Sequence, residues 1–139
     1  MSKQIVQTNN APAAVGPYSQ AVIAGGFMFL AGQIPLVPET KALVEGDIQA
    51  QTRQVLENIK AVVESVGATL DDVVKTSVFL ADLDDFAKMN EIYAQYFFHN
   101  PPARSTFQVA KLPMRANVEI EAVVKLPDVV DAVSNLKID

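Results

Sequence analysis

Three charged residues interrupt two stretches that otherwise have the composition of β-strands. In "ARSTFQVAKLPMRANVEIEAVV", residues 103–124, Arg104 lies in the first stretch, and Glu119 and Glu121 lie in the second. Side chains alternate along a strand, so Arg104 shares a face with Thr106, and Glu119 shares one with Glu121. The sequence therefore predicts two strands joined by a polar turn, each with one polar face and one apolar face.

Arg104 and Glu119 have two interpretations. If the apolar strand faces lie under helices, the polar faces point toward a partly desolvated subunit interface. There, an Arg–Glu ion pair could fix strand pairing or subunit contact. Alternatively, the planar guanidinium binds a substrate carboxylate, and a nearby Glu119, kept ionised by the cation, accepts a proton from water. The spacing of the residues leaves both interpretations open.

The remaining composition excludes most other kinds of active site. The chain contains no cysteine, which excludes disulfides, thiolate nucleophiles and thiolate metal sites. Its single histidine, His99, precedes two prolines and is interpreted as a solvated loop residue, so no His-cluster metal site forms within one chain. A phosphate-binding motif of the GxxxxGK[ST] type is also absent. We therefore expect acid–base or electrostatic chemistry by carboxylate, arginine, tyrosine and backbone amide groups.

Two further polar residues allow a structural and a functional interpretation. Tyr18 follows "VGP" and precedes an apolar run, so it is either an edge aromatic residue or part of a site. Asn90 falls between Met89 and Tyr93 on the apolar stripe of a predicted helix. A buried amide needs a hydrogen-bond partner, which is either a local backbone atom or a group at the edge of a site.

Charge and hydropathy narrow the class of partner. The formal net charge is −5 and the pI about 4.8, so the long-range field repels polyanions, and we expect no nucleic-acid partner. The opening "MSKQIVQTNNAPAAVG" has neither the apolar run of a secretory signal nor an Arg-rich amphipathic pattern. No apolar run reaches the roughly 18 residues of a membrane span. These features predict a cytoplasmic protein.

Turn residues and hydrophobic periodicity predict the elements that position these side chains. Gly25 and Gly26 separate two apolar runs and predict a hairpin at about 19–31. From Ile48 the apolar residues recur on one helical face, with Asp47 placed to cap the helix and Gly67 placed to end it. The other predicted elements are a weak strand near Gln4–Gln7, a strand at 72–80, a helix within 84–98, and the two strands of residues 103–124.

This order predicts one α+β domain over residues 1–139, with both helices on one face of a mixed sheet of about six strands. No remaining element can cover the opposite face of the sheet, which predicts self-association through that face. Residues 126–139 form a C-terminal extension that could be a short helix or a tail.

Four collinear segments resemble the RidA family, also called the YjgF family, over about residues 3–125. They are "APAAVGPYSQAV", "AGQIPLVPETKALV", "QTRQVLENIKAVVESVGATLDDVVKTSVFLADLDDFAKMNEIYAQYF" and "PPARSTFQVAKLPMRANVEIEAVV". The resemblance implies a chorismate-mutase-like fold and a homotrimer with sites in the clefts between subunits. It also implies a cofactor-free 2-iminobutanoate/2-iminopropanoate deaminase. Such an enzyme hydrolyses imines, which arise from enamines released by pyridoxal-phosphate-dependent dehydratases, to 2-keto acids and ammonia.

The resemblance also implies roles for individual residues. Arg104 would bind the substrate carboxylate and Glu119 would orient the water, while Tyr18, Asn90 and the backbone N–H of Gly32 would contact the substrate. Thr106 stands where many members have cysteine, and Ala31 stands where members often have serine. We expect both departures to affect substrate preference more than activity.

Two alternative functions remain open. The same cleft could bind small carboxylates without turnover, as a sensor or regulatory module. Some relatives are described as ribonucleases or translation inhibitors, but the acidic pI and the lack of a positioned histidine argue against RNA cleavage.

Overall fold

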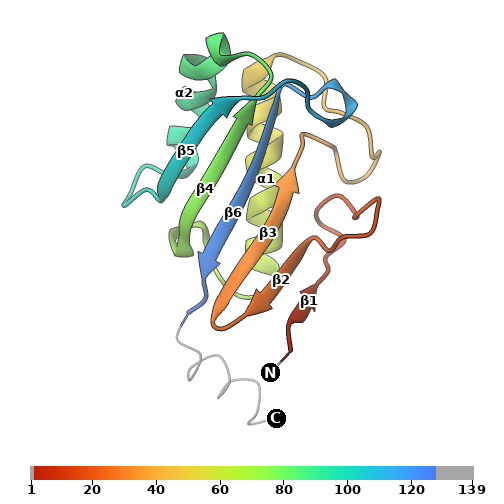
Figure 1. The fold of residues 1–139 in the computed structure, drawn as a ribbon, viewed down its shortest axis with the longest axis vertical. Helices are drawn as coiled ribbons and strands as arrows, with labels where there is room; N and C mark the ends of the chain where they lie inside the picture. Colours follow the sequence, from red (N-terminus) through yellow and green to blue (C-terminus); the bar gives the residue numbers. More distant parts are fainter. Residues whose placement is uncertain (1, 128–139) are drawn as a thin grey trace.

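A six-stranded mixed sheet is covered on one face by two helices in the computed structural model, which describes residues 2–127 (Figure 1). The predicted α+β class is therefore confirmed, while the predicted extension lies outside the described residues from position 128 onward. The strands are β1 (Gln4–Val6), β2 (Ala21–Ala24), β3 (Phe27–Gln33), β4 (Val73–Leu80), β5 (Ala103–Gln108) and β6 (Val118–Lys125), and the helices are α1 (Ile48–Ser65) and α2 (Phe86–Tyr96). Short 3-10 turns span Leu70–Asp72, Leu83–Asp85 and Pro113–Arg115.

The strand order is β1-β2-β3-β6-β4-β5. All neighbouring strands run antiparallel except β4 and β5, which are parallel and connected through α2. The two strands of residues 103–124 therefore do not form a hairpin with each other, because β4 lies between them. This arrangement puts β5, which carries Arg104, at one edge of the sheet (Figure 1).

The glycine pair forms the predicted hairpin between β2 and β3. Gly25 and Gly26 have φ angles of 61° and 84°, which glycine adopts without steric cost. Ala24 and Phe27 face each other across the turn, as a two-residue connection requires.

Helix α1 begins and ends near the predicted residues. The Asp47 carboxylate accepts a hydrogen bond from the Ala50 N–H at 3.0 Å, and Gly67 follows the helix with a φ of 84°. The buried face of α1 carries Ile48, Val55, Leu56, Ile59, Val62 and Val63. Although α1 has 18 residues, no helix within the described range is long and apolar enough to cross a membrane.

The hydrophobic core lies between the helices and the sheet. Strand β6 lies centrally and alternates strictly, with Val118, Ile120, Ala122 and Val124 all buried against the helices. Met89 of α2 is fully buried in the same core. Removing each of these larger side chains from water stabilises the fold by about 1.5–3 kcal/mol, so this layer determines which face of each strand turns inward.

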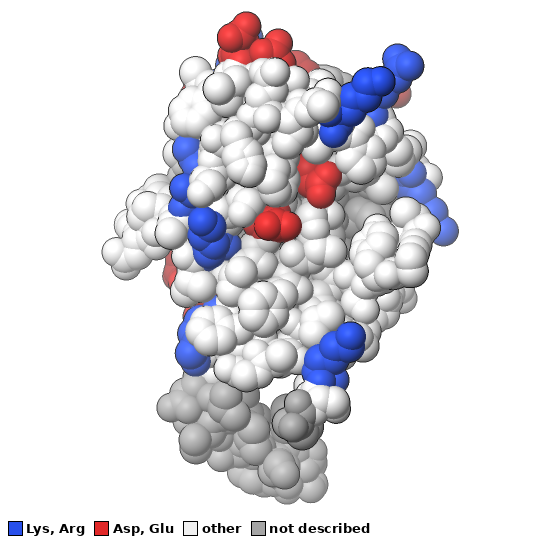
Figure 2. Space-filling view, viewed as in Figure 1, with Lys and Arg blue, Asp and Glu red and all other residues white. Residues whose placement is uncertain are grey.

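The opposite face of the sheet is open and carries large apolar side chains. Phe29 of β3 and Phe107 of β5 are nearly half exposed, and the Phe107 ring packs 5.3 Å from that of Phe79 on β4. Figure 2 shows this face as a broad uncharged surface with acidic atoms near its middle and basic atoms mainly at its margins. Large exposed apolar side chains on an uncovered sheet face are typical of an interaction surface.

Candidate active site

Glu119 lies on the open face of β6, directly over Gly32 of β3. A Cβ atom at position 32 would overlap Oε2 of Glu119 and lie 2.9 Å from its Cδ, so any larger residue there would force the Glu119 side chain out of this position. The pairing of β3 with β6 shifts register between Leu30 and Gln33, which places Gly32 within an irregular part of the strand. Irregularities of this kind often adjust a side chain next to a functional site.

A cavity of about 470 Å³ opens beside this carboxylate. Tyr18, Gly32, Lys41 and Glu119 contribute its polar lining, whereas much of the remaining wall is apolar. Tyr18 is 52 % exposed, and its hydroxyl accepts a hydrogen bond from the Val15 N–H at 3.4 Å. The structure therefore brings three of the predicted site residues, Tyr18, Gly32 and Glu119, to one hollow.

Gln20 positions the segment that carries Tyr18, a role that sequence reasoning missed. Its buried amide nitrogen donates to the carbonyl groups of Thr8, Ala11 and Pro12 at 3.0, 3.3 and 2.8 Å. Its amide oxygen accepts from the Thr8 N–H at 2.7 Å. All of these partners are backbone atoms, so no side-chain pattern in the sequence signals the role.

Burial raises the pKa of Glu119 above its ordinary value, and the neighbouring Glu121 carboxylate raises it further. The two glutamates lie two positions apart on the same face of β6, where a like charge disfavours ionisation. The expectation that Arg104 keeps Glu119 ionised is wrong for the single chain. Instead, Glu119 holds a proton more readily than an exposed carboxylate does.

Arg104 belongs to a second group of polar residues, between β5 and α2. Its Nη1 donates to Oδ1 of Asn90 at 2.6 Å, and its guanidinium carbon lies 4.7 Å from the ring centre of Tyr93 and 5.4 Å from that of Phe86. Asn90 therefore bonds to a side chain rather than to a local backbone atom. A guanidinium has five N–H donors, so this bond leaves others available to a carboxylate.

Thr106 completes this second group. It lies two residues after Arg104 on the same face of β5, and its Oγ1 is buried without a hydrogen-bond partner within residues 2–127. Most buried hydroxyl groups have a partner, so an unpaired one beside an arginine marks a place where a ligand atom could bind.

The two groups lie on opposite faces of the sheet, which corrects the prediction that both polar faces point toward the interface. Arg104 and Thr106 are in register with Thr76 and Val78, which are fully buried under the helices. Glu119 is in register with Phe79, on the open face. The β5 prediction failed because its apolar residue, Phe107, faces outward while Arg104 packs against α2. Within one chain, Arg104 and Glu119 therefore form neither an ion pair nor a joint site.

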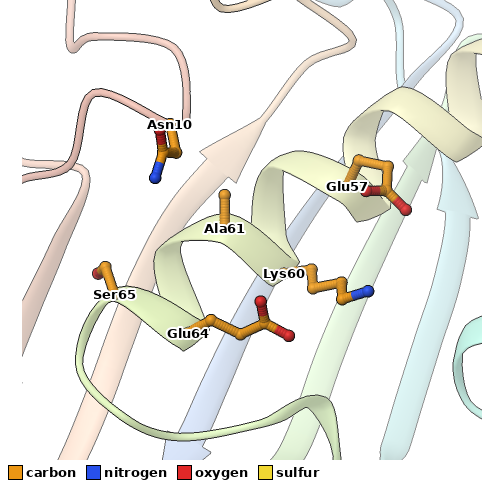
Figure 3. A pocket seen from close by; sticks show the side chains of 6 residues that line it. All are labelled: Asn10, Glu57, Lys60, Ala61, Glu64 and Ser65. Carbon is orange, nitrogen blue, oxygen red and sulfur yellow. The ribbon is translucent and has the colours of Figure 1, made fainter.

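Another hollow, of about 350 Å³, lies along the outer side of α1 (Figure 3). Figure 3 shows Glu57, Lys60 and Glu64 extending from one side of the helix, with Asn10 approaching from the N-terminal segment. None of the predicted site residues lines it. Charges of both signs on a surface helix are typical of a solvated face.

Comparison with known proteins identifies the family. A sequence model of the family described as Endoribonuclease L-PSP matches residues 8–126. The chain belongs to the RidA (YjgF) family. One relative is a RutC family protein of Pyrococcus horikoshii, 55 % identical over 121 residues that cover 87 % of this chain and 96 % of the relative.

Another relative, named 2-iminobutanoate/2-iminopropanoate deaminase, comes from Salmonella typhimurium. It is 52 % identical over 126 residues, covering 88 % of this chain and 97 % of the relative. Among solved structures, Escherichia coli TdcF with bound serine superposes with a TM-score of 0.85 at 43 % identity, covering 89 % of this chain and 99 % of TdcF. The recognised family is therefore confirmed, and a hydrolase function agrees with the names of some of its members.

Proposed function

We propose that the protein is a cofactor-free 2-iminobutanoate/2-iminopropanoate deaminase that works as a homotrimer. The observation that carries the proposal is that the site residues form two groups on opposite faces of the sheet. Arg104 with Asn90 forms a carboxylate-binding group at an edge strand, and Glu119 with Gly32 forms a base and a cavity on the open face. Each group lacks what the other supplies, so a neighbouring subunit would complete the site.

The arrangement supports a simple hydrolysis. A protonated imine is already electrophilic, so the protein must mainly hold the substrate and place a water over its C=N carbon. Arg104 would bind the carboxylate through two N–H groups, and the Gly32 N–H would contribute a further hydrogen bond. Glu119 would accept a proton as the water oxygen bonds to carbon. That proton then moves to the nitrogen, and the C–N bond breaks as the new hydroxyl group gives its proton to the departing ammonia. Ammonium and a 2-keto acid are released.

The raised pKa of Glu119 suits this role. A general base works best when its pKa lies close to the operating pH, because it then binds a proton strongly while remaining largely deprotonated. Burial over Gly32 and the nearby Glu121 move the carboxyl group in that direction. The substrate carboxylate, rather than Glu119, would pair with Arg104 on the other side of the proposed cleft.

The open face supports the assembly. Phe29, Phe79 and Phe107 would leave water when a second copy packs against this face, and the apolar area they offer drives association. Arg104 lies on the edge strand next to this face, where an adjoining subunit can bring its own Glu119 close to it. Thr106 would then offer its unpaired hydroxyl to the substrate.

The test couples the purified protein to a threonine dehydratase in the presence of semicarbazide, which competes for the imine. We expect the wild-type protein to accelerate formation of 2-ketobutyrate and Arg104→Ala to lose this acceleration while keeping its assembly state. Lys111→Ala, which removes an exposed cation from the loop before β6, serves as the matched control. Full activity of Arg104→Ala would contradict the proposal.

A binding module without turnover is the second candidate, because the solved structure of TdcF contains bound serine. It predicts saturable binding of 2-keto acids or small amino acids by a protein that does not accelerate imine hydrolysis.

RNA cleavage, suggested by the family description, requires a protein of net charge −5 to bind a polyanion. Incubation with RNA at low salt would reveal it.

A further inference from the structure

The cavity beside Glu119 has an apolar wall that the proposed hydrolysis does not use. Val15, Leu36, Pro113 and Met114 contribute to this wall, in the same cavity as the carboxylate and Gly32. Water, a substrate carboxylate and an imine nitrogen are all polar and gain nothing from such a surface. An apolar wall in a site of this kind instead favours an apolar part of the ligand.

The cavity is also larger than the smallest imino acids need. Its volume of about 470 Å³ falls within the range of roughly 300–1,000 Å³ that is typical of small-molecule sites. The imines of alanine and 2-aminobutyrate have only a handful of non-hydrogen atoms, and their side chains are a methyl and an ethyl group. A longer side chain would fill more of the apolar wall.

Met114, which lines this cavity, has an unfavourable backbone conformation. Its φ is 56° and its ψ 22°, the left-handed region, which costs a bulky L-residue about 1–2 kcal/mol. Met114 is 55 % exposed, so burial in the hydrophobic core does not offset this energetic cost. Strained residues of this kind cluster at ligand-binding sites, which makes a functional role for Met114 worth testing.

The surrounding loop keeps this conformation in place. The Arg115 N–H donates to the Leu112 carbonyl at 3.2 Å, and the Ala116 N–H donates to the Pro113 carbonyl at 3.1 Å. The Asn117 N–H is held by the side chain of Gln51 on α1 at 2.8 Å. Arg115 also has a left-handed φ, of 60°, but it lines a separate cavity with Lys111.

We propose that Met114, with Val15 and Leu36, forms a subsite for the side chain of the imino acid and selects substrates with apolar side chains longer than ethyl. This proposal rests on the proposed function and extends it to substrate preference. Methionine is flexible and polarisable, so it can adapt to unbranched and branched aliphatic chains. Each methylene group that enters such a subsite can change kcat/KM by about 10-fold or more.

The two left-handed residues provide a matched pair of variants. Asparagine tolerates this backbone conformation better than most residues do, so Met114→Asn and Arg115→Asn should both fold. Only Met114→Asn removes apolar surface from the subsite. Circular dichroism and size-exclusion chromatography of both variants would establish folding and assembly before any kinetic comparison.

An amino-acid oxidase would generate imines in situ from alanine, 2-aminobutyrate, leucine and methionine, with semicarbazide as the competing trap. We expect wild type to prefer the leucine and methionine imines in kcat/KM. Met114→Asn should reduce the ratio of the methionine to the alanine imine by about 10-fold. Arg115→Asn should keep the wild-type ratio, and Met114→Leu should largely restore it.

An unchanged ratio in Met114→Asn would overturn the subsite, even if every imine is hydrolysed. A wild-type protein that accelerates no imine would instead overturn the proposed function. Binding then tests the subsite independently, by calorimetric titration with pyruvate and with 4-methyl-2-oxopentanoate. Tighter binding of the longer keto acid, abolished by Met114→Asn, supports the subsite, and equal binding of the two contradicts it.

Discussion

At the residue scale, Glu119 shows how the surroundings of a carboxyl group alter its chemistry. Gly32 allows the backbone of β3 to approach the carboxylate, which buries it, and Glu121 adds a like charge two positions along β6. Both effects raise the pKa of Glu119. Tyr18 and Lys41 line the same cavity, while Phe79 is the in-register neighbour on β4. The pKa of this carboxyl group should therefore depend on Glu121.

The pH dependence of hydrolysis tests this dependence. A general base must be deprotonated, so activity should fall as the pH falls through the pKa of Glu119. Glu121→Gln removes one cause of the raised pKa, and the acidic limb of the kcat/KM profile should move to lower pH. Glu119→Gln should lower activity on the order of 100-fold and abolish that limb.

Glu64→Gln on the outer side of α1 provides the control for a change in net charge, since Glu64 lines the separate hollow along that helix. Its pH profile should match that of the wild type. An acidic limb that stays in place in Glu121→Gln would show that Glu121 does not influence the catalytic carboxyl group.

At the element scale, the helices position the Arg104 group from beneath the sheet. Asn90 and Tyr93 on α2 hold the guanidinium, and the Tyr93 hydroxyl lies 2.7 Å from Oγ1 of Thr76 on β4. Helix α2 in turn packs against α1, where the Tyr96 hydroxyl donates to Glu57 at 2.6 Å. The geometry of Arg104 thus depends directly on α2 and, through the packing of the two helices, on α1.

The N-terminal cap of α1 provides a prediction about stability. Asp47→Ala removes the acceptor of the Ala50 N–H and should lower the free energy of unfolding by about 1 kcal/mol. Asp47→Asn should preserve most of the stability, because asparagine caps helices about as well as aspartate does. Urea denaturation followed by circular dichroism measures both. Equal stabilities of the alanine and asparagine variants would argue against the cap.

At the scale of the whole molecule, the placement of Arg104 and Glu119 on opposite faces would make the proposed function depend on assembly. One sheet cannot present Arg104 and Glu119 to the same ligand, because its register places them on opposite faces. A closed ring of subunits offers a solution, in which the edge strand of each subunit meets the open face of the next. A monomer should then have little activity even though it contains every required residue.

Mixed assemblies test this arrangement directly. Arg104→Ala and Glu119→Gln should each be nearly inactive alone. If the two variants are unfolded, mixed in equal amounts and refolded, some sites would combine the intact Arg104 of one subunit with the intact Glu119 of its neighbour. Random mixing in a three-membered ring predicts recovery of about a quarter of the wild-type activity.

A mixture that stays inactive would show that both residues must come from the same chain. Analytical ultracentrifugation of the refolded sample provides the control, because it shows whether trimers formed. Mixing Arg104→Ala with wild type gives the reference for the efficiency of exchange.

Local patterns in the sequence determined most of the elements. The spacing of apolar residues from Ile48 predicted α1, and Gly25 with Gly26 predicted the turn between β2 and β3, because helix periodicity and positive φ angles are properties of short segments. Strict alternation in β6 also identified the open face that carries Glu119. The types and positions of the residues alone singled out Arg104, Glu119, Tyr18 and Asn90 as candidates. The family resemblance was needed for Gly32 and for the site role of Thr106.

Only the tertiary structure decided how these residues come together. Arg104 turned out to face α2 because β5 is an edge strand that pairs in parallel with β4, which its own sequence does not reveal. The hydrogen bonds of Gln20 and the position of Met114 at the cavity likewise depend on residues that are separated along the chain. A sequence determines which face of a strand is apolar, but pairing between strands determines what each face meets.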